Sequence, residues 1–570
     1  MSKIKSPKTK PLVYNQKVKP VREANNVNKI EKRNSLFDIL NNLLGNNDKF
    51  LFYFILSSCL LFSLLLLNIR ISEGGDDSTY IEVAYNYSQD FFNYYYTFQA
   101  PLYPMLLSVI IQFAGINLIL FKFVSIIFNF MSIVLLLKAL TNKVPPLVLY
   151  PVAFLTAINA TFLYYASQTY TEAFFMFLQG LLIYLFTKLP EEEKSLKEVS
   201  KNRKIWVLFG LIVFLLTITK NVAIITVPAL IIYFVIQKRL YSLAAFVTSF
   251  AIFKGPFEVL KKLIWKDATQ YSSQGNVLLL KDPYDPSQGA ESIAGFVSRL
   301  SQNSNLYLSK RLFQILGLKA EDSVEINGGL MLLVVTFCII GIVTIFRRRN
   351  KLLLFIAIYT ALMVAGTFIA LQTRWDQSRL ILVFVPFILI IILYGFHEIL
   401  KKYSFSVQSL YLYVIIGLLI AGTMKTFSKT AENIPIVRKN LKGDQYYGYT
   451  QDWANFLKLS EWCGKNLPEE SLVVSRKAPM SFIYSKGKKF HPVYKTFSTD
   501  ADTVLASFKV SGVTHVILAS LRRNPQKADG NVINTIHRII QPISQKYPEK
   551  LTMIRQEGTH EPAFLYKINY

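Results

Sequence analysis

Long apolar runs separated by short polar segments fill this chain between residues 50 and 427. Runs such as residues 51–67, 205–218 and 330–346 are long enough, or nearly so, to cross about 30 Å of hydrocarbon as helices. The pattern predicts about eleven membrane-spanning helices, which is more than the core of a soluble protein requires. We expect these spans near residues 50–69, 118–138, 145–164, 172–187, 204–219, 222–237, 240–256, 328–346, 351–371, 379–396 and 408–424.

A further apolar stretch at residues 101–115 could form either a membrane span or a helix that does not cross the membrane. It has only about fifteen residues, and it contains Pro101 and Pro104 near its start. If it crossed the membrane, the orientation of every later span would be inverted. Its length favours a re-entrant or interfacial helix on the outer side of the membrane.

The pattern changes after residue 427, where segments typical of soluble helices and strands alternate. We expect helices at residues 453–463 and 532–544, and strands at residues 471–475, 515–518 and 564–568. Such alternation is typical of a small α/β domain, here of about 130 residues.

The expected fold is therefore a polytopic α-helical membrane protein with a small C-terminal α/β soluble domain. Residues 1–49 are rich in Lys, Asn and Pro and predict a largely disordered cytoplasmic basic tail, with a short helix near residues 36–44. Residues 50–427 form the expected transmembrane domain, with outer loops at 70–117 and 257–327, and residues 428–570 form the α/β domain.

The net charge of +27 is informative because of where the charged residues lie along the chain. The Lys and Arg residues gather at the ends of the apolar runs, and membrane proteins keep such loops on the cytoplasmic side. Every second loop carries this excess, whereas residues 71–117 contain neither Lys nor Arg. The distribution argues against a nucleic-acid partner. It predicts a multi-pass protein of a cytoplasmic membrane, contacting membrane lipids, with the N-terminus inside and the C-terminal domain outside.

Adjacent carboxylates stand at the start of the first outer loop, at Asp76 and Asp77. A third acid, Glu172, is expected on the same side of the membrane, among aromatic residues that favour a protein interior over lipid. A carboxylate there could act as a general base on a hydroxyl, and the three together could hold a divalent cation. The alternative is structural, because Asp76 and Asp77 could cap a helix and Glu172 could begin one.

Four cations are expected at the same membrane face as these acids. Lys122 lies in the outer half of a span, Lys220 ends another, and Arg374 and Arg379 flank a short outer loop. A buried cation is costly, and a bound phosphate would compensate that cost. Lys122 and Lys220 could instead extend to lipid head groups. Acids and cations on one face suit transfer from a lipid phosphate, with a base for the acceptor and cations for the departing phosphate.

Cys59, Cys338 and Cys463 are too scattered for a metal cluster or a disulfide framework.

With these residues in place, the sequence resembles the GT-C superfamily of polyprenyl-phosphate-sugar glycosyltransferases, and in particular the protein O-mannosyltransferases and the aminoarabinose transferases of lipid A. Asp76-Asp77-Ser78-Thr79-Tyr80 followed by Pro101-Leu102-Tyr103-Pro104 is similar to the first outer loop of that family. Thr171-Glu172, and Arg379-Leu380 with Pro386, are similar to later landmarks.

The resemblance implies an inverting glycosyltransferase that moves a sugar from a polyprenyl-phosphate carrier to a hydroxyl of a lipid, glycan or protein acceptor outside the cytoplasm. It implies that Asp76 is the catalytic base, with Asp77 as the alternate. By the same resemblance Glu172 and Tyr80 belong to the substrate pocket, and the donor phosphate would be bound by Lys122, Lys220, Arg374 and Arg379. No cofactor is required, although Asp76, Asp77 and Glu172 could hold a divalent cation.

The sequence also departs from the family pattern. Gln99-Ala100 stands where the aminoarabinose transferases carry Glu-Lys, so lipid A is not carried over as the acceptor. The usual Arg-Tyr of the last landmark is Arg379-Leu380 here. Two other classes of function stay open. A transporter or flippase of a polyprenyl-linked or other anionic lipid would also need outer-face cations, and an assembly protein could use its soluble domain to bind a partner.

Overall fold

The computed structural model describes residues 35–570 except for residues 73, 97–98, 191–194, 266–273, 284–285 and 529–530. Most of the expected basic tail therefore lies outside the described residues. The short helix expected near residues 36–44 is α1 (Leu36–Asn46), which Ser35 caps by accepting a hydrogen bond from the backbone N–H of Asp38.

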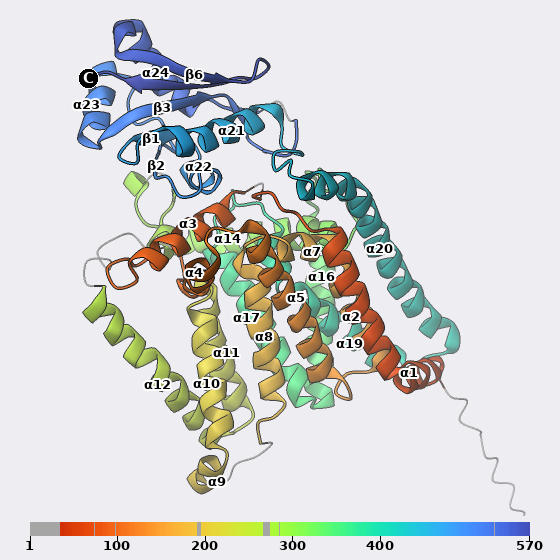
Figure 1. Ribbon diagram of the computed structural model, residues 1–570. Helices are drawn as coiled ribbons and strands as arrows, with labels where there is room; N and C mark the ends of the chain where they lie inside the picture. The colour runs from red at the N-terminus through yellow and green to blue at the C-terminus, as the bar shows by residue number, and fades with distance from the viewer. Residues whose placement is uncertain are drawn as a thin grey trace, which may run out of the picture.

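Long apolar helices form the body of the molecule (Figure 1). Among the described residues, six are long and apolar enough to cross a membrane alone. These are α2 (Asp48–Leu65), α5 (Leu118–Leu140), α12 (Leu240–Ile264), α16 (Gly328–Arg348), α17 (Lys351–Ala370) and α20 (Phe405–Leu441). The chain is thus a multi-pass membrane protein.

A seventh span is broken in the middle. α6 (Pro146–Ile158) and α7 (Ala160–Ala166) meet at a bend of 53°. Asn159 sits at the break, where its side-chain oxygen accepts hydrogen bonds from the N–H groups of Thr161 and Phe162 and caps α7. A polar cap of this kind ends one helix and starts the next, which explains why the expected span 145–164 is not straight.

The remaining expected spans coincide with shorter helices or broken pairs. These are α8 (Thr171–Phe186), α10 (Arg203–Thr217), η1 (Asn221–Ile225) with α11 (Thr226–Ile236), and α18 (Arg379–Leu382) with α19 (Val385–Leu400). Every span expected from the sequence thus has a helical counterpart, while the count of eleven is not confirmed by length and composition alone. The Lys-rich helix α9 (Leu196–Lys201) lies at the end of the bundle opposite the C-terminal domain (Figure 1).

The end of the bundle that carries the C-terminal domain also carries helices that do not span it (Figure 1). α3 (Asp76–Gln89) and α4 (Leu102–Ala114) lie between the bundle and the C-terminal domain (Figure 1). The long outer loop contributes α13 (Gln274–Leu279), η3 (Pro286–Gln288), α14 (Ile293–Leu306), η4 (Tyr307–Arg311) and α15 (Leu312–Ile315). The expectation that residues 101–115 form a non-spanning helix agrees with the position of α4.

The C-terminal domain is built on a five-stranded mixed sheet in the order β2-β1-β3-β7-β6. β2 (Phe490–Pro492), β1 (Leu472–Ser475) and β3 (Val513–Ala519) are parallel, and β7 (Ala563–Ile568) and β6 (Leu551–Glu557) add antiparallel strands. Its helices are α21 (Gln451–Asn466), α22 (Ala478–Tyr484), α23 (Ala501–Val510) and α24 (Thr535–Lys546). A small ribbon of β4 (Leu521–Arg522) and β5 (Val532–Ile533) and the turn η5 (Pro548–Lys550) complete it.

Successive strand residues serve two different cores, because side chains alternate across a sheet. Val474 and Val516 pack with α23 and α24 in a core of the domain's own. Val473 and Ile517 face α21 and α22 and belong to the same apolar cluster as the membrane helices. The C-terminal domain is therefore packed onto the membrane domain through one face of its sheet.

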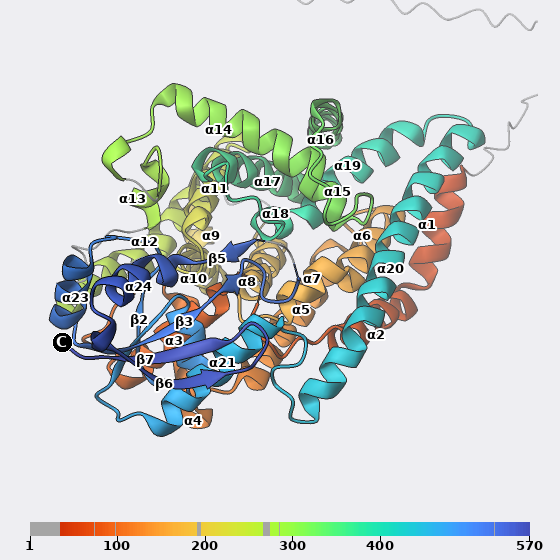
Figure 2. The same cartoon turned by 90° about the horizontal axis from the view of Figure 1, so that it is seen from above.

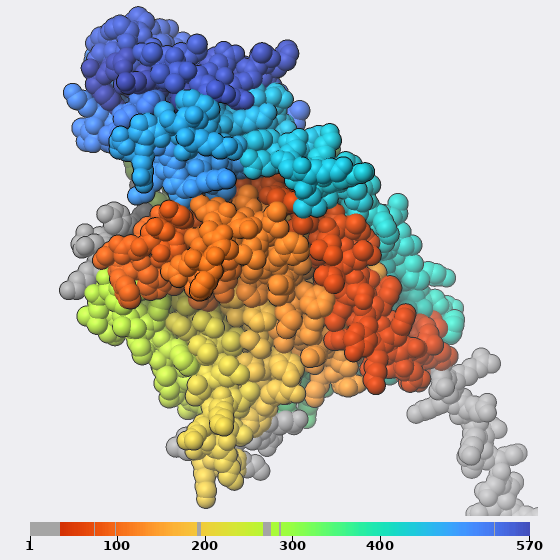
Figure 3. All heavy atoms as spheres, in the orientation of Figure 1, coloured from red at the N-terminus to blue at the C-terminus, as the bar shows by residue number. Residues whose placement is uncertain are grey.

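This packing covers only part of the bundle. Seen from above, the domain lies over α3 and α4, while α14 and α16 lie beside it (Figure 2). The space-filling view shows the domain seated directly on the segment that contains α3 and α4 (Figure 3). α20 runs through the expected domain boundary at residues 427–428 without a break and ends at Leu441.

Candidate functional site

The acidic pair stands at the first turn of α3, just after a tight change of backbone direction. Gly75 has φ of +75°, a left-handed conformation that side-chain-bearing residues rarely adopt, and it precedes the helix directly. Asp76 and Asp77 are the first two helical residues. Successive helical residues point about 100° apart, so the two carboxylates enter different surroundings.

Asp77 is a buried positioning residue. Its side chain is fully buried and accepts hydrogen bonds from the N–H and hydroxyl of Ser72, both at 2.9 Å, and from the N–H of Ser78 at 3.0 Å. Burial raises the pKa of this carboxyl, against the opposing effects of Lys122 and the Ser72 hydrogen bonds. Both carboxylate oxygens are thus engaged in holding the loop that precedes α3.

Asp76 has a more open position. Its side chain is 38% exposed and forms an ion pair with Arg379 at the start of α18. The Arg379 guanidinium lies 4.8 Å from the centre of the Tyr170 ring and donates a hydrogen bond to the side chain of Gln377 at 2.7 Å. Arg379 is therefore held on three sides, and it fixes the direction of the one carboxylate of the pair that solvent reaches.

A cavity of about 140 Å³ adjoins Arg379, and we call it the Glu172 cavity. Glu172 is 2% exposed and pairs with Lys220 through one oxygen at 2.8 Å, while its second oxygen has no hydrogen-bond partner among the described residues. Tyr80 also lines the cavity, and so do Gln99 and Ala100. The lining also includes apolar side chains: Leu278, Leu371, Leu380, Val383 and Phe384. The cavity thus combines charged and apolar lining residues.

Two of the expected donor-binding cations lie elsewhere. Lys122 is fully buried and donates hydrogen bonds to the carbonyl of Arg70 at 2.6 Å and to the side chain of Gln168 at 2.7 Å, so it does not extend to lipid head groups. Arg374 is half exposed and pairs with Asp282 at 2.8 Å. Neither residue lines the Glu172 cavity. The structure therefore brings together Asp76, Tyr80, Glu172, Lys220 and Arg379 and leaves Lys122 and Arg374 outside this group.

The three acids do not converge as metal ligands. Asp76 pairs with Arg379, Glu172 pairs with Lys220, and Asp77 is occupied by serine donors. Within the part of the chain that the structure describes, no group of three His, Cys, Asp or Glu side chains could hold a metal ion.

One residue of this site has no signal in the sequence. Lys477, in the connection between β1 and α22, reaches the acidic loop from the C-terminal domain, with its ammonium 3.7 Å from where a Cβ on Gly75 would stand. The ammonium forms no hydrogen bond or ion pair with any described residue, and burial lowers its pKa. Only the packing of the two domains brings this cation to Asp76 and Asp77.

No protein-family model matches the chain, and no curated protein matches its sequence. Solved structures are similar in fold. The crystal structure of ArnT from Cupriavidus metallidurans bound to undecaprenyl phosphate superposes with a TM-score of 0.53 at 10% identity, covering 90% of this chain and 97% of that chain. ArnT in the apo state gives a TM-score of 0.50 at 10% identity with the same coverage. The Archaeoglobus fulgidus oligosaccharyltransferase in the apo form gives a TM-score of 0.49 at 12% identity, covering 82% of this chain and 70% of that chain.

The likeness to ArnT extends over nearly the whole of both chains. It confirms at the level of the fold the resemblance drawn from the outer-loop motifs.

Proposed function

We propose that this membrane protein, which has the GT-C fold, is an inverting glycosyltransferase. It moves a sugar from a polyprenyl-phosphate carrier to an acceptor hydroxyl on the extracytoplasmic side of a cytoplasmic membrane. One observation carries the proposal: the accessible carboxylate of Asp76 forms an ion pair with Arg379, and Arg379 also lines the cavity that contains Glu172 and Lys220.

The reaction is a single displacement at the anomeric carbon. The acceptor oxygen forms a bond to that carbon while the bond from the carbon to the phosphate oxygen breaks. The acceptor proton passes to the Asp76 carboxylate, and the electron pair leaves with the polyprenyl phosphate. A positioned base of this kind contributes typically about 10²–10⁴-fold to a rate.

The Glu172 cavity suits the sugar-phosphate end of the donor. The unpartnered oxygen of Glu172 can accept a hydrogen bond from a sugar hydroxyl, and Lys220 and Arg379 supply positive charge. The apolar lining residues suit the first isoprene units. Cations aimed at the phosphate stabilise the negative charge that develops as it departs. The ArnT structure with bound undecaprenyl phosphate supports this class of donor.

Lys477 adds a cation to this site from above. It lies partly buried beside the acidic loop, where Asp76 and Asp77 attract it electrostatically, but it forms no ion pair with any described residue. A charged group left unpaired in a buried place is costly, and a donor phosphate would compensate that cost. The C-terminal domain thus takes part in transfer through this side chain.

The proposal is tested by transfer from radiolabelled polyprenyl-phosphate sugars in membranes that contain wild-type protein, Asp76→Asn or Asp90→Asn at equal expression. Asp90 is an exposed acid at the end of the same helix α3, so it is a matched control. We expect Asp76→Asn to lose at least about a hundredfold in activity, because the base is removed, and Asp90→Asn to keep wild-type activity.

Equal activity of Asp76→Asn and wild type would rule out Asp76 as the base. If no donor is turned over while the lipid still binds, a transporter or flippase becomes the better explanation. An anomeric configuration in the product that matches the donor would contradict an inverting reaction.

A further inference from the structure

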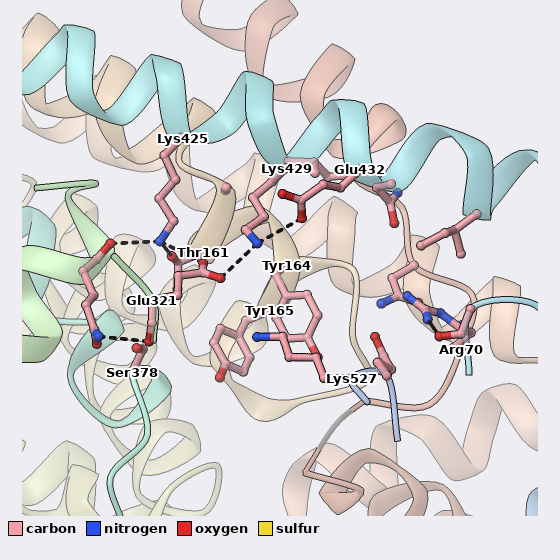
Figure 4. Close-up of a pocket in the computed structure, with 18 of the residues that line it drawn as sticks. Arg70, Thr161, Tyr164, Tyr165, Glu321, Ser378, Lys425, Lys429, Glu432 and Lys527 are labelled. Atoms are coloured by element: carbon pink, nitrogen blue, oxygen red, sulfur yellow. Dashed lines mark hydrogen bonds and ion pairs between the residues drawn. The ribbon is translucent and has the colours of Figure 1, made fainter. Parts of the chain in front are cut away.

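The structure has a second cavity, of about 380 Å³, which we call the basic cavity (Figure 4). Ser378 lines this cavity, and the next residue, Arg379, lines the Glu172 cavity. Tyr165, which also lines the basic cavity, packs against Tyr170, the ring under Arg379. A group bound there is therefore next to the elements that orient Asp76.

The basic cavity gathers positive charge from four separate segments. Its lining cations are Arg70 before α3, Arg311 at the end of η4, Lys425 and Lys429 on α20, and Lys527 between β4 and β5. Two carboxylates, Glu321 and Glu432, face them. Figure 4 shows Arg70 at one end of the cavity and Lys425 at the other, with Lys527 across from α20. An excess of cations in a cavity of this size fits an anionic ligand.

The contacts of Lys425 and Lys429 show where the anion would bind. Both ammonium groups contact the Glu321 carboxylate, at 3.2 and 3.0 Å, and that carboxylate is 42% exposed. Lys425 itself is 11% exposed and also donates to the hydroxyl of Thr161 at 3.0 Å and the carbonyl of Gln314 at 2.8 Å. Lys425 is thus held in place without Glu321, so an incoming anion can replace the Glu321 carboxylate.

Lys527 is the cation that lacks any such partner. It is exposed at the cavity, and it forms no hydrogen bond or ion pair with any residue that the structure describes. Because it belongs to the C-terminal domain, the basic cavity is closed only when that domain is docked. The paired lysines of α20 and the single lysine of the docked domain together surround a ligand from two sides.

We propose that the basic cavity binds a phosphate-bearing group of the acceptor, so that the enzyme glycosylates anionic acceptors in preference to neutral ones. This proposal rests on the proposed function. The donor occupies the Glu172 cavity, and the acceptor phosphate is anchored between Lys425, Lys429 and Lys527. The acceptor hydroxyl is then directed toward Asp76, because that carboxylate pairs with Arg379, the residue next to Ser378 of the basic cavity. Oxygen atoms of a phosphate suit several ammonium donors at once.

Binding is measured on the full-length protein in nanodiscs of zwitterionic phosphatidylcholine, titrated with glucose 6-phosphate or with glucose. We expect glucose 6-phosphate to bind and the double variant Lys425→Gln/Lys429→Gln to weaken its binding at least about tenfold, because charge-assisted hydrogen bonds are lost. Lys442→Gln, an exposed change just beyond the end of the same helix, should bind like wild type. Glu321→Gln should bind several-fold more tightly, because the competing carboxylate is gone.

The assignment would be overturned if the wild type showed no preference for glucose 6-phosphate over glucose, or if the double variant bound it as wild type does. Loss of binding in Lys220→Gln alone would also overturn it, because the phosphate would then bind in the Glu172 cavity. Thermal denaturation of each variant distinguishes lost binding from lost folding. The binding assay uses no sugar donor, so it is independent of the transfer assay. A protein that transfers no sugar but still binds glucose 6-phosphate through Lys425 and Lys429 would overturn the proposed transferase activity and leave the anion site in place.

A second arm identifies the source of the phosphate. Phosphatidic acid is added to the nanodiscs, and its competition with glucose 6-phosphate is measured. Competition assigns the cavity to the head group of a lipid acceptor, and its absence assigns the cavity to a soluble or polymeric phosphorylated glycan. Both outcomes support an anionic acceptor.

Discussion

Adjacent residues of the same type take different roles at this site. Asp76 and Asp77 are indistinguishable in sequence, yet Asp77 is fully buried among serine donors and Asp76 faces Arg379 and solvent. The sequence motif predicted a pair of carboxylates with Asp76 as base and Asp77 as alternate. The geometry favours Asp76, because only its carboxylate is accessible to an acceptor, and that assignment stays a prediction until the variant is measured.

Glu82 on α3 predicts a pH dependence of stability. Burial raises the pKa of this carboxyl from 4.5 to about 7. A folded-state pKa above the unfolded value means that the folded protein holds the proton more tightly, so stability falls as pH rises from about 4.5 to about 7. The full loss is at most about 3.5 kcal/mol, at about 1.4 kcal/mol for each pKa unit.

We expect the thermal denaturation midpoint of Glu82→Gln, measured in detergent, to fall less between pH 5 and pH 8 than that of wild type. Glu470→Gln changes an exposed glutamate of the C-terminal domain and should follow the wild-type curve. Parallel curves for Glu82→Gln and wild type would show that Glu82 does not titrate in this window.

At the scale of elements, small residues allow two membrane helices to cross closely. A Cβ on Gly395 of α19 would lie 2.6 Å from the Cα of Gly341 on α16, and a Cβ on Gly341 would lie 2.3 Å from the carbonyl oxygen of Ile391. Both distances are shorter than real contacts. Packing between apolar helices in lipid depends on such close approach, because the hydrophobic effect gives no preference for helix over lipid.

Gly395→Ala is therefore expected to destabilise the protein by about 1–3 kcal/mol through overpacking. Gly417→Ala is the matched control, because it lies within α20 and a Cβ there meets no atom within 4 Å. The control should be neutral or stabilising by up to about 1 kcal/mol, since alanine favours helix. Thermal denaturation in detergent compares the two, and equal stability would contradict the close crossing.

The expected spans differ in how well their pattern predicted their length. α16 and α17 follow the expected ranges closely, because each is one uninterrupted apolar run. The runs at 145–164 and 379–396 are divided, at Asn159 and after α18. Asn159 caps the helix after the first break, whereas the second break has no side-chain cap and is followed by Pro386 near the start of α19. Apolar composition identifies a membrane segment but does not report such interruptions.

At the scale of the whole molecule, the C-terminal domain completes the site. Phe482 of α22 packs edge-on against Tyr85 of α3, with ring centres 5.1 Å apart, which fixes the domain over the acidic loop. Lys477 reaches Gly75 through the same contact region. The sequence left the role of this domain open, and the docked arrangement supports the proposal that the domain contributes Lys477 to the site.

Lys477→Met tests that role. We expect donor turnover to fall at least about tenfold, because a cation facing the departing phosphate is removed. The denaturation midpoint should change little, because burial disfavours this charge while Asp76 and Asp77 attract it. Lys489→Met, an exposed change in the same domain, should alter neither quantity. A drop in stability together with activity would instead assign Lys477 a structural role.

The sequence by itself determined that the chain has many apolar helices and an α/β region after them, while the alternating sidedness of its loops stays a prediction. The apolar helices follow from local composition, because a spanning helix satisfies its own backbone hydrogen bonds and needs only apolar side chains. Only the tertiary structure decided which of those residues meet. Asp76 and Arg379 are 303 positions apart, and Lys122 and Arg374 lie outside the Glu172 cavity although their sequence context resembled that of Lys220. Lys477 reaches the acidic loop, and Lys527 reaches the basic cavity, only because the C-terminal domain is docked. Contacts between distant segments depend on packing and not on the residues beside them in the chain.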